Sequence, residues 1–205
     1  GQEAVAASLP LYHIYGQVGA LLVGIRIGAT LVLFTSLDLG HILSTMERER
    51  VTVFYGVPAL YDVLKDHSKT LWVNWKRVKL IVSGADALPE STAAAWEART
   101  GRSIMEGFGM TETAGVSHVT PPQSIRRGSF GVPIPNVDAA VAHLETGALL
   151  PVGEVGELLL SGPNITSGYW RRDEENRRSF VEIDGRRWLR TGDIVRMDED
   201  GFFYI

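Results

Sequence analysis

The chain has 205 residues, 45% of them apolar, and a formal net charge of −4 from 20 Lys and Arg against 24 Asp and Glu. This length and composition suit a folded domain with a sizeable core and argue against intrinsic disorder. Without a basic face, the mildly acidic balance gives a nucleic-acid partner no electrostatic support. The sequence contains no Cys, which excludes disulfides and thiolate metal sites and agrees with the cytoplasmic location that we expect. The longest apolar run, residues 16–27, is too short for a transmembrane segment.

The first half of the chain alternates short apolar runs with helical patterns. Strands are predicted at residues 4–9, 30–34, 51–55, 78–82 and 103–106, and helices at residues 39–50, 58–66 and 89–99. Because strand and helix alternate, we expect parallel strands joined by right-handed crossovers, with flanking helices. Ligands of such sheets bind at the carboxyl ends of the strands, and small residues let a ligand approach the backbone. This predicts a ligand site at the loops 55–57, 83–85 and 107–109.

The second half changes character near Gly128. Short alternating strands and frequent turn residues replace the helices, apart from a helical stretch at residues 173–178. We therefore predict an α/β fold with a parallel-rich sheet at residues 1–127, followed by a smaller, mainly β, barrel-like subdomain at residues 128–205. The chain opens without Met and closes on an apolar strand, so we expect it to be an internal piece of a longer protein.

Four segments carry the strongest signal, and they follow one another along the chain. They are PLYHIYG at residues 10–16, GFGMTET at 107–113, GEL with SGYW at 156–158 and 167–170, and WLRTGD at 188–193, which DEDGF follows at 198–202. Together they resemble the motifs of the adenylate-forming acyl-CoA synthetases, a family that often has Tyr in place of Phe108. The resemblance covers nearly the whole chain. It implies the fold of these enzymes and places the adenine and acyl pockets in the first subdomain.

The resemblance also implies an activity, namely that of an acid–thiol ligase. A carboxylic acid, which we expect to be a fatty acid, would react with ATP to give an acyl-adenylate, and the acyl group would then pass to coenzyme A. Negative charge gathers where the phosphates and the carboxylate meet, so a Mg²⁺ ion held by one carboxylate and by substrate phosphates is the expected device. The resemblance assigns this metal to Glu112.

Three residues are candidates for the chemistry itself: His13, Thr111 and Glu112. The Thr111 hydroxyl can donate to a phosphate oxygen, although Thr in this setting is also common as a turn or cap residue. The resemblance places His13 near the reacting carboxylate, to which a neutral imidazole can donate one hydrogen bond. The alternative for His13 is a partly buried histidine with no role in binding. Val57, Gly107 and residues near Ile14 would wall the acyl pocket.

The nucleotide-binding residues implied by the resemblance come from three segments. They are Gly84, Ala85, Asp86, Gly107, Phe108, Gly109, Met110, Thr111 and Asp193. Phe108 offers a flat face to adenine, or else is a core aromatic at a strand end. Asp193 can accept two hydrogen bonds from the ribose hydroxyls, and Gly-Asp is also a common turn sequence, here expected in a hairpin at residues 190–193. We expect Glu112 and Asp193 to converge on one nucleoside pocket.

The resemblance also predicts parts that this chain lacks. The family's phosphate-binding loop would precede Gly1, and its lid domain with the catalytic Lys would follow Ile205. We therefore expect this piece alone not to form adenylates and to bind ATP or AMP weakly.

Three other readings of the sequence differ in function. The first is an adenylation unit with another acceptor, as in luciferases or peptide synthetases. The second is a non-catalytic binding module that keeps the nucleotide fold. A third, a dinucleotide-binding oxidoreductase, fits poorly because Gly107-x-Gly109 lacks the third glycine of that fingerprint.

Overall fold

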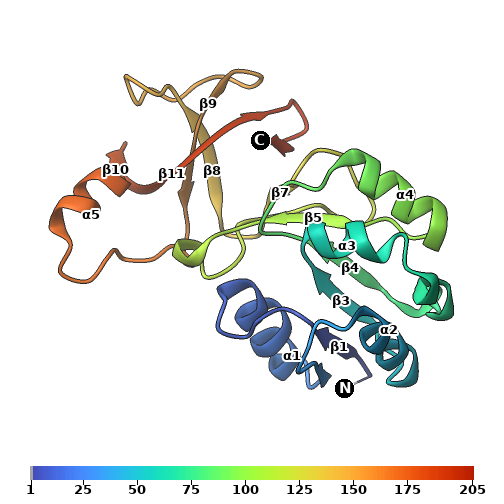
Figure 1. Ribbon diagram of the computed structural model, residues 1–205. Coiled ribbons are helices and arrows are strands. Elements are labelled where there is room, and N and C mark those ends of the chain that lie inside the picture. The colour runs from blue at the N-terminus through green and yellow to red at the C-terminus, as the bar shows by residue number, and fades with distance from the viewer. Residues whose placement is uncertain (1) are drawn as a thin grey trace.

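The computed structural model describes residues 2–205, which form a larger and a smaller sheet packed side by side (Figure 1). The larger sheet has seven strands in the order β2-β1-β3-β4-β5-β6-β7. Its strands are β1 (Ala4–Ala7), β2 (Thr30–Leu33), β3 (Val53–Gly56), β4 (Leu80–Ser83), β5 (Met105–Phe108), β6 (His118–Val119) and β7 (Val132–Pro133). Strands β1 to β5 run parallel, and β6 and β7 add an antiparallel edge. The predicted α/β class with a parallel-rich sheet is confirmed.

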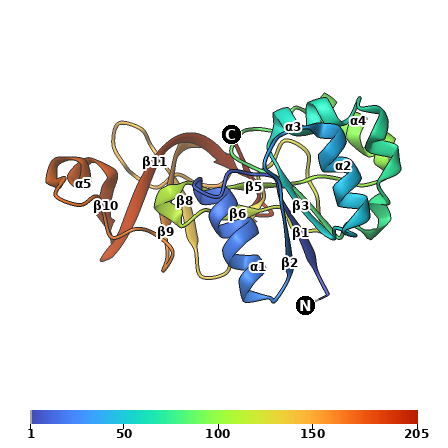
Figure 2. The ribbon, with the colours of Figure 1, turned by 60° about the horizontal axis from the view of Figure 1, so that its bottom comes forward.

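Helices cover both faces of this sheet (Figure 2). One face carries α2 (Leu39–Arg48), α3 (Pro58–Leu64) and α4 (Glu90–Thr100), and the other carries the π-helix η1 (Gly16–Leu22) continued by α1 (Val23–Arg26). The 3₁₀ turns are η2 (Ser68–Trp72), η3 (Trp75–Arg77) and η4 (Thr111–Thr113).

The ends of the predicted helices follow from local chemistry. Asp38 caps α2, since its Oδ1 accepts a hydrogen bond from His41 N at 2.6 Å. Pro58 opens α3 at a position where its missing N–H is not needed, and Gly101 ends α4 in the left-handed region at φ 67°. The sequence did not predict the helix at residues 16–26, because its three glycines interrupt the apolar pattern and favour a loop.

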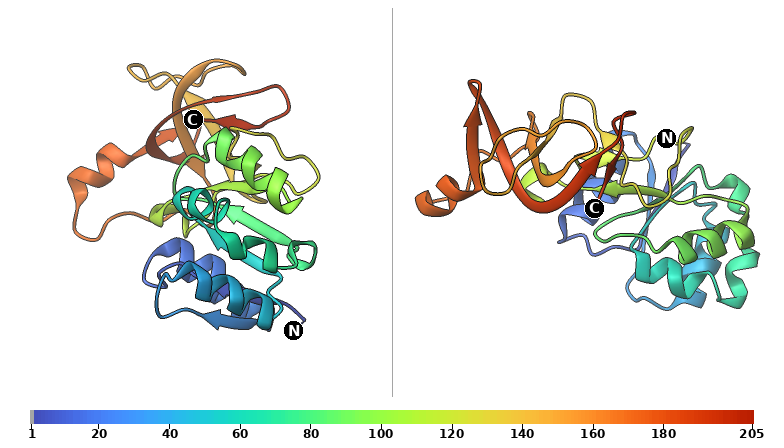
Figure 3. Two further views of the ribbon diagram at one scale, coloured as in Figure 1. Left: turned by 45° about the vertical axis from the view of Figure 1, so that its right-hand side comes forward. Right: turned by 90° about the horizontal axis from the view of Figure 1, so that it is seen from above.

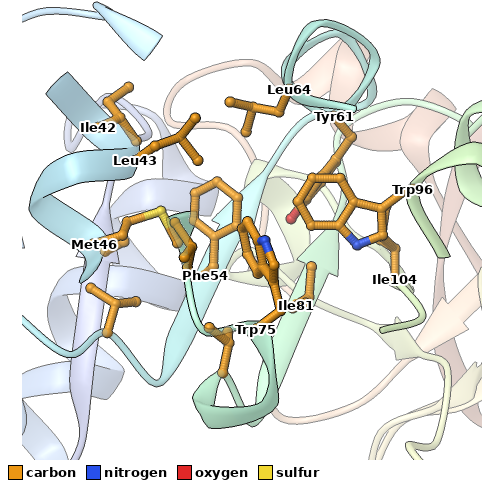
Figure 4. Close-up of a cluster of buried hydrophobic side chains, with 14 of the residues drawn as sticks. Ile42, Leu43, Met46, Phe54, Tyr61, Leu64, Trp75, Ile81, Trp96 and Ile104 are labelled. Atoms are coloured by element: carbon orange, nitrogen blue, oxygen red, sulfur yellow. The ribbon is translucent and has the colours of Figure 1, made fainter. Parts of the chain in front are cut away.

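The main hydrophobic core lies between the sheet and helices α2 to α4 (Figure 4). Four aromatic side chains form its centre: the rings of Trp75 and Trp96 are 4.7 Å apart, those of Tyr61 and Trp96 are 5.2 Å apart, and Phe54 packs edge-on to Tyr61. The Tyr61 hydroxyl donates to the carbonyl oxygen of Val82 at 2.8 Å, so this buried polar group is satisfied. The core thus clamps α3 and α4 onto β3 and β4.

The smaller sheet is antiparallel and curls into a half-barrel, with β11 bending through it (Figure 3). Its strands are β8 (Asp138–Ala142), β9 (Val155–Ser161), β10 (Phe180–Ile183), β11 (Arg186–Met197) and β12 (Phe203–Tyr204), and α5 (Asp173–Ser179) precedes β10. The predicted smaller β part is confirmed. The larger sheet nevertheless takes β7 from beyond the predicted boundary at 127/128, and Gly131 bridges to Phe203 of the smaller sheet.

The expected hairpin turn at residues 190–193 is wrong. These residues lie inside β11, where the register against β9 shifts between Arg190 and Ile194. The shift has the character of a bulge, a feature that bends a strand and redirects side chains, and Asp193 lies within it. Among residues 2–205, no helix combines the length and the apolar composition needed to cross a membrane.

A buried histidine, His118, sits where the two sheets meet. Its side chain is fully buried, with the rings of Phe130 and Phe203 at 5.1 Å and 4.7 Å. Nδ1 lies 3.0 Å from Ser117 Oγ, and Nε2 has no hydrogen-bond partner within residues 2–205. Burial lowers the pKa of His118 to about 3, because the apolar cage disfavours the imidazolium.

We expect His118 to make the protein less stable in acid. The unfolded chain binds this proton near pH 6.5 and the folded chain only near pH 3, so the free energy of unfolding falls as pH drops below about 6.5 by up to ~1.4 kcal/mol per pH unit. Denaturant titrations at pH 7.5 and 5.0 should show a smaller loss for His118→Gln than for the wild type. The same substitution at the exposed His143 is the control, and equal losses in all three proteins would contradict this prediction.

Candidate functional site

Two adjoining cavities lie at the carboxyl ends of the parallel strands. The smaller, of about 270 Å³, is lined by residues 85–87, 106–109, 128, 130, 193 and 205. The larger, of about 540 Å³, is lined by residues from η1, from β3 to β5 and from the 107–116 turn. The two share Ala85, Gly107, Phe108 and Gly109. Every predicted catalytic and nucleotide-binding residue lines one cavity or both. Glu112 lines the larger cavity and Asp193 the smaller, so the two acids that we expected in one nucleoside pocket lie in adjoining cavities that share a wall.

The turn that follows β5 has a fixed shape. A Cβ atom on Gly109 would lie 2.4 Å from the carbonyl oxygen of Gly115, so only glycine fits where the turn closes on itself. Thr113 is buried and takes the cap role, since its Oγ1 accepts from Met110 N at 3.0 Å. Thr111 is exposed, and no bond within the described turn engages its hydroxyl. That hydroxyl is therefore free to donate to a ligand.

Glu112 is half-buried and lines the larger cavity. Its Oε1 accepts a hydrogen bond from the Tyr169 hydroxyl at 2.7 Å, and its Oε2 accepts none from the described part of the chain. Carboxylate oxygen is a ligand that Mg²⁺ prefers, so Glu112 fits the expected metal. Within residues 2–205 no group of three or more His, Asp and Glu side chains is arranged to hold a metal. Glu112 would therefore share the ion with oxygens of the substrate and water.

An ion pair joins Glu157 of the Gly-Glu-Leu motif to Arg190 of the Arg-Thr-Gly-Asp motif and positions the segment that carries Asp193. Glu157 is 7% exposed and accepts from Arg190 Nη2 at 2.6 Å, from Arg190 Nε at 2.9 Å and from Gly192 N at 3.1 Å. Thr191 Oγ1 donates to the carbonyl oxygen of Leu158 at 3.0 Å and accepts from Asp193 N at 3.1 Å. The Gly-Glu-Leu motif on β9 thus holds the bulge of β11 in shape. Burial, with a smaller contribution from Glu157, raises the pKa of Asp193.

We expect Glu157→Gln to lower both stability and nucleotide affinity. The substitution keeps the size of the side chain but removes the charge that holds Arg190, which we expect to lower the free energy of unfolding by about 1–3 kcal/mol. Denaturant titration and calorimetric AMP binding measure the two effects. Glu154→Gln, at an exposed position near the start of the same strand, is the control. A loss of stability with unchanged AMP affinity would show that the bulge does not position Asp193 for a ligand.

The loop after β4 forms another wall of the smaller cavity. Ala85 adopts the left-handed region at φ 71°, a strained conformation for a residue with a Cβ atom. Asp86 is exposed, and its Oδ1 accepts from Ala87 N at 2.8 Å. Glu106, which the sequence analysis missed, supports this loop from β5: its Oε2 accepts from Leu88 N at 3.3 Å. Burial raises the pKa of Glu106, which lines the smaller cavity together with Asp86 and Asp193.

Phe108 packs as a core aromatic at a strand end and also borders both cavities. Its ring lies 4.8 Å from that of Phe130 and 6.0 Å from that of His118, so it is part of the aromatic cluster between the sheets. It also lines both cavities, next to Gly107 and Gly109, and is only partly buried.

His13 is exposed and lines the larger cavity, so it is not a buried core histidine. Its Nδ1 accepts from Tyr15 N at 3.2 Å, which leaves Nε2 available as a donor. Ile14 and Gly107 also line this cavity. Val57 is not among the lining residues and instead occupies the position just before α3.

Two tyrosines that the sequence analysis did not single out shape the larger cavity. The rings of Tyr15 and Tyr55 meet edge-on at 5.9 Å, and the Tyr15 hydroxyl donates to the carbonyl oxygens of Val82 and Gly56 at 3.2 and 3.4 Å. Burial raises the pKa of both tyrosines. The other lining residues from η1 and the sheet are mostly apolar: Val18, Gly19, Val23, Leu80, Val82, Met105, Val119 and Ile134. The cavity therefore suits a hydrocarbon group.

A wider, more open depression of about 710 Å³ lies between β8, the 161–167 loop and the β10–β11 hairpin. It contains none of the residues predicted for the site, and its two cations are already engaged. Arg186 pairs with Asp138 at 2.5 Å, and Arg187 donates to the carbonyl oxygen of Ser167 at 2.9 Å. The predicted catalytic and nucleotide-binding residues therefore line the two adjoining cavities and not this depression.

Comparison with known proteins agrees with this geometry. The chain is 35% identical over 206 residues to a long-chain-fatty-acid–CoA ligase of Bacillus subtilis (strain 168). The matching region covers 100% of this chain and 36% of that relative. It therefore spans about a third of the length of such relatives. The solved structure of ATP-bound MatB from Rhodopseudomonas palustris superposes with a TM-score of 0.90 at 32% identity, covering 99% of this chain and 39% of that one.

A second solved structure contains a metal ion. O-succinylbenzoate coenzyme A synthetase (MenE) from Bacillus subtilis, in complex with ATP and magnesium, superposes with a TM-score of 0.86 at 27% identity and covers 99% of this chain and 41% of that one. The family model described as AMP-binding enzyme matches residues 1–170, which is well over half of the chain. The chain therefore belongs to the family of AMP-binding enzymes.

Proposed function

We propose that the protein, at its natural length, uses ATP to convert a carboxylic acid into an acyl-adenylate and then transfers the acyl group to coenzyme A. The observation that carries the proposal is the shared wall of the two cavities. Ala85 and residues 107–109 separate a pocket that holds Asp193 from an apolar pocket lined by His13 and Glu112. A nucleoside in the first and an acid in the second would meet at this wall, where the two substrates must react.

Each predicted residue has a role that its surroundings allow. Asp193 accepts hydrogen bonds from the ribose hydroxyls, while Phe108 and the loop of Gly84, Ala85 and Asp86 enclose the adenine. Thr111 donates its hydroxyl to a phosphate oxygen. His13 donates to the carboxylate of the acid, which orients it for attack.

The chemistry consists of two balanced steps. A carboxylate oxygen forms a bond to the α-phosphorus of ATP as the bond to pyrophosphate breaks. The thiol of coenzyme A gives its proton to solvent, and its sulfur then bonds to the acyl carbon as the bond to AMP breaks. Glu112 would hold a Mg²⁺ ion, which when bound offsets the negative charge at the reacting phosphates.

The lining of the larger cavity favours an acid with an aliphatic tail. Valines, leucine, methionine and isoleucine dominate it, and the Tyr15 hydroxyl already donates to backbone carbonyls. Apart from His13, Thr111 and Glu112, the polar side chains of this lining are those of Tyr15, Tyr55 and Ser83. A substrate with several polar substituents would find too few partners there and would lose its hydration. We therefore propose a fatty acid rather than an aryl acid, although the similar MenE is named for an aromatic substrate.

The test is a panel of fatty and aryl acids given to the protein at its natural length with ATP and Mg²⁺. Acid-dependent pyrophosphate exchange reports the first step, and AMP release on addition of coenzyme A reports the second. We expect both with fatty acids. Exchange without any response to coenzyme A would indicate another acceptor, as in luciferases or peptide synthetases, and no exchange with any acid would contradict the proposal.

A further inference from the structure

One loop of the smaller sheet reaches across to the turn that carries Glu112. Asn164 Nδ2 donates to the carbonyl oxygens of Thr113 at 2.9 Å and Val116 at 3.0 Å. Thr166 N donates to the carbonyl oxygen of Glu112 at 2.8 Å, which fixes the backbone of that residue. These bonds tie residues about fifty positions apart and leave the turn little freedom to move.

The same loop also holds the Glu112 side chain, through Tyr169. The Tyr169 hydroxyl donates to Oε1 at 2.7 Å, a charge-assisted bond between groups 57 positions apart. Oε2 is left without a partner in the described part of the chain and is the oxygen available to a ligand.

Tyr169 is in turn positioned by helix α5. Tyr169 N donates to Asn176 Oδ1 at 2.7 Å, and Asn176 Nδ2 donates to the carbonyl oxygen of Tyr169 at 2.9 Å. Gly168 allows this approach, because a Cβ atom there would lie 2.7 Å from Asn176 Oδ1. A continuous chain of contacts therefore runs from α5 through Tyr169 to Glu112.

We propose that Tyr169 is a positioning residue that orients the Glu112 carboxylate for the divalent cation that accompanies ATP. The inference rests on the proposed function, since it assigns the cation to Glu112. An unrestrained Glu side chain must give up rotamer freedom when it binds a metal, and a held one has already done so. Groups that orient a metal ligand in this way typically contribute 10–100-fold to metal affinity.

The test is Tyr169→Phe, which removes only the hydroxyl, in the protein at its natural length. Binding of a non-hydrolysable ATP analogue is titrated by calorimetry at a series of Mg²⁺ concentrations, and binding of AMP is measured without metal. We expect the Mg²⁺ concentration for half-maximal analogue binding to rise about ten-fold and AMP affinity to stay the same. Tyr204→Phe is the matched control, because it breaks another tyrosine–carboxylate bond, at 2.9 Å to Asp198, away from Glu112.

Each result supports or overturns the inference. An unchanged Mg²⁺ requirement in Tyr169→Phe overturns it, and a lowered one shows that the hydroxyl competes with the metal instead. A crystal structure of the variant adds a readout without ligand: more than one Glu112 rotamer supports the inference, and a single unchanged rotamer contradicts it. If the wild type binds neither the analogue nor AMP, the proposed function fails and the inference falls with it. If the wild type binds the analogue and the variant binds it equally well, the inference about Tyr169 is wrong and the proposed function still stands.

Discussion

Replacing Glu112 with Gln in the protein at its natural length should slow acyl-adenylate formation by about 100-fold or more, the scale typical of losing a group that stabilises charge in the transition state. Gln keeps the size of the side chain and an oxygen that can accept from Tyr169, so the fold should survive. What is lost is the charge that would hold Mg²⁺. Pyrophosphate exchange measures the rate, and calorimetric AMP binding should be unchanged.

The control for this experiment is Glu145→Gln, an exposed carboxylate in the turn between β8 and β9, where full activity is expected. A rate within two-fold of the wild type in Glu112→Gln would contradict the assignment of Glu112. It would favour the reading of the chain as a binding module without catalysis, which predicts that this residue can be changed without effect.

Trp96→Ala should lower the free energy of unfolding by about 3–5 kcal/mol, the range for large aromatic residues removed from a core. Trp96 is fully buried, and its ring contacts those of Tyr61 and Trp75. Its loss leaves a cavity under α4 beside the buried rings of Tyr61 and Trp75, which are held by their own packing. Denaturant titration followed by circular dichroism measures the change.

Trp72→Ala is the control for this prediction. Trp72 is 64% exposed and contacts Lys69, so its removal should change stability by only about 0.5 kcal/mol. Equal losses for the two variants would mean that the aromatic cluster is not the centre of the folding unit.

The sequence predicted the five parallel strands of the larger sheet, because each is a short apolar run, and it predicted the crossover helices α2, α3 and α4. The helix at residues 16–26 was missed for a physical reason. Glycine has a low helix propensity, and only packing against the sheet, where Ala20 is fully buried, compensates for it. The bulge at residues 190–194 was also missed, because it exists only in the pairing of β11 with β9.

The candidate site also combines residues that the sequence predicted with contacts that it did not predict. His13, Glu112 and Asp193 were located by motif, and the topology of the sheet brought their segments to one edge. The contacts that hold these residues could not be predicted: Glu157 lies 33 positions from Arg190 in the sequence, and Tyr169 lies 57 positions from Glu112. Sequence spacing does not reveal which distant side chains meet, since that depends on how the smaller sheet packs against the larger one.

Side chains alternate along the four residues of β4, so that one face of the strand packs in the core and the other borders a cavity. Ile81 points into the aromatic core beneath the helices, while its neighbours Leu80 and Val82 line the apolar cavity on the opposite face. Substitutions at Leu80 and Val82 therefore change the lining of the cavity, while Ile81 keeps its place in the core packing. The shape of the cavity can therefore change through this strand while the core of the fold stays the same.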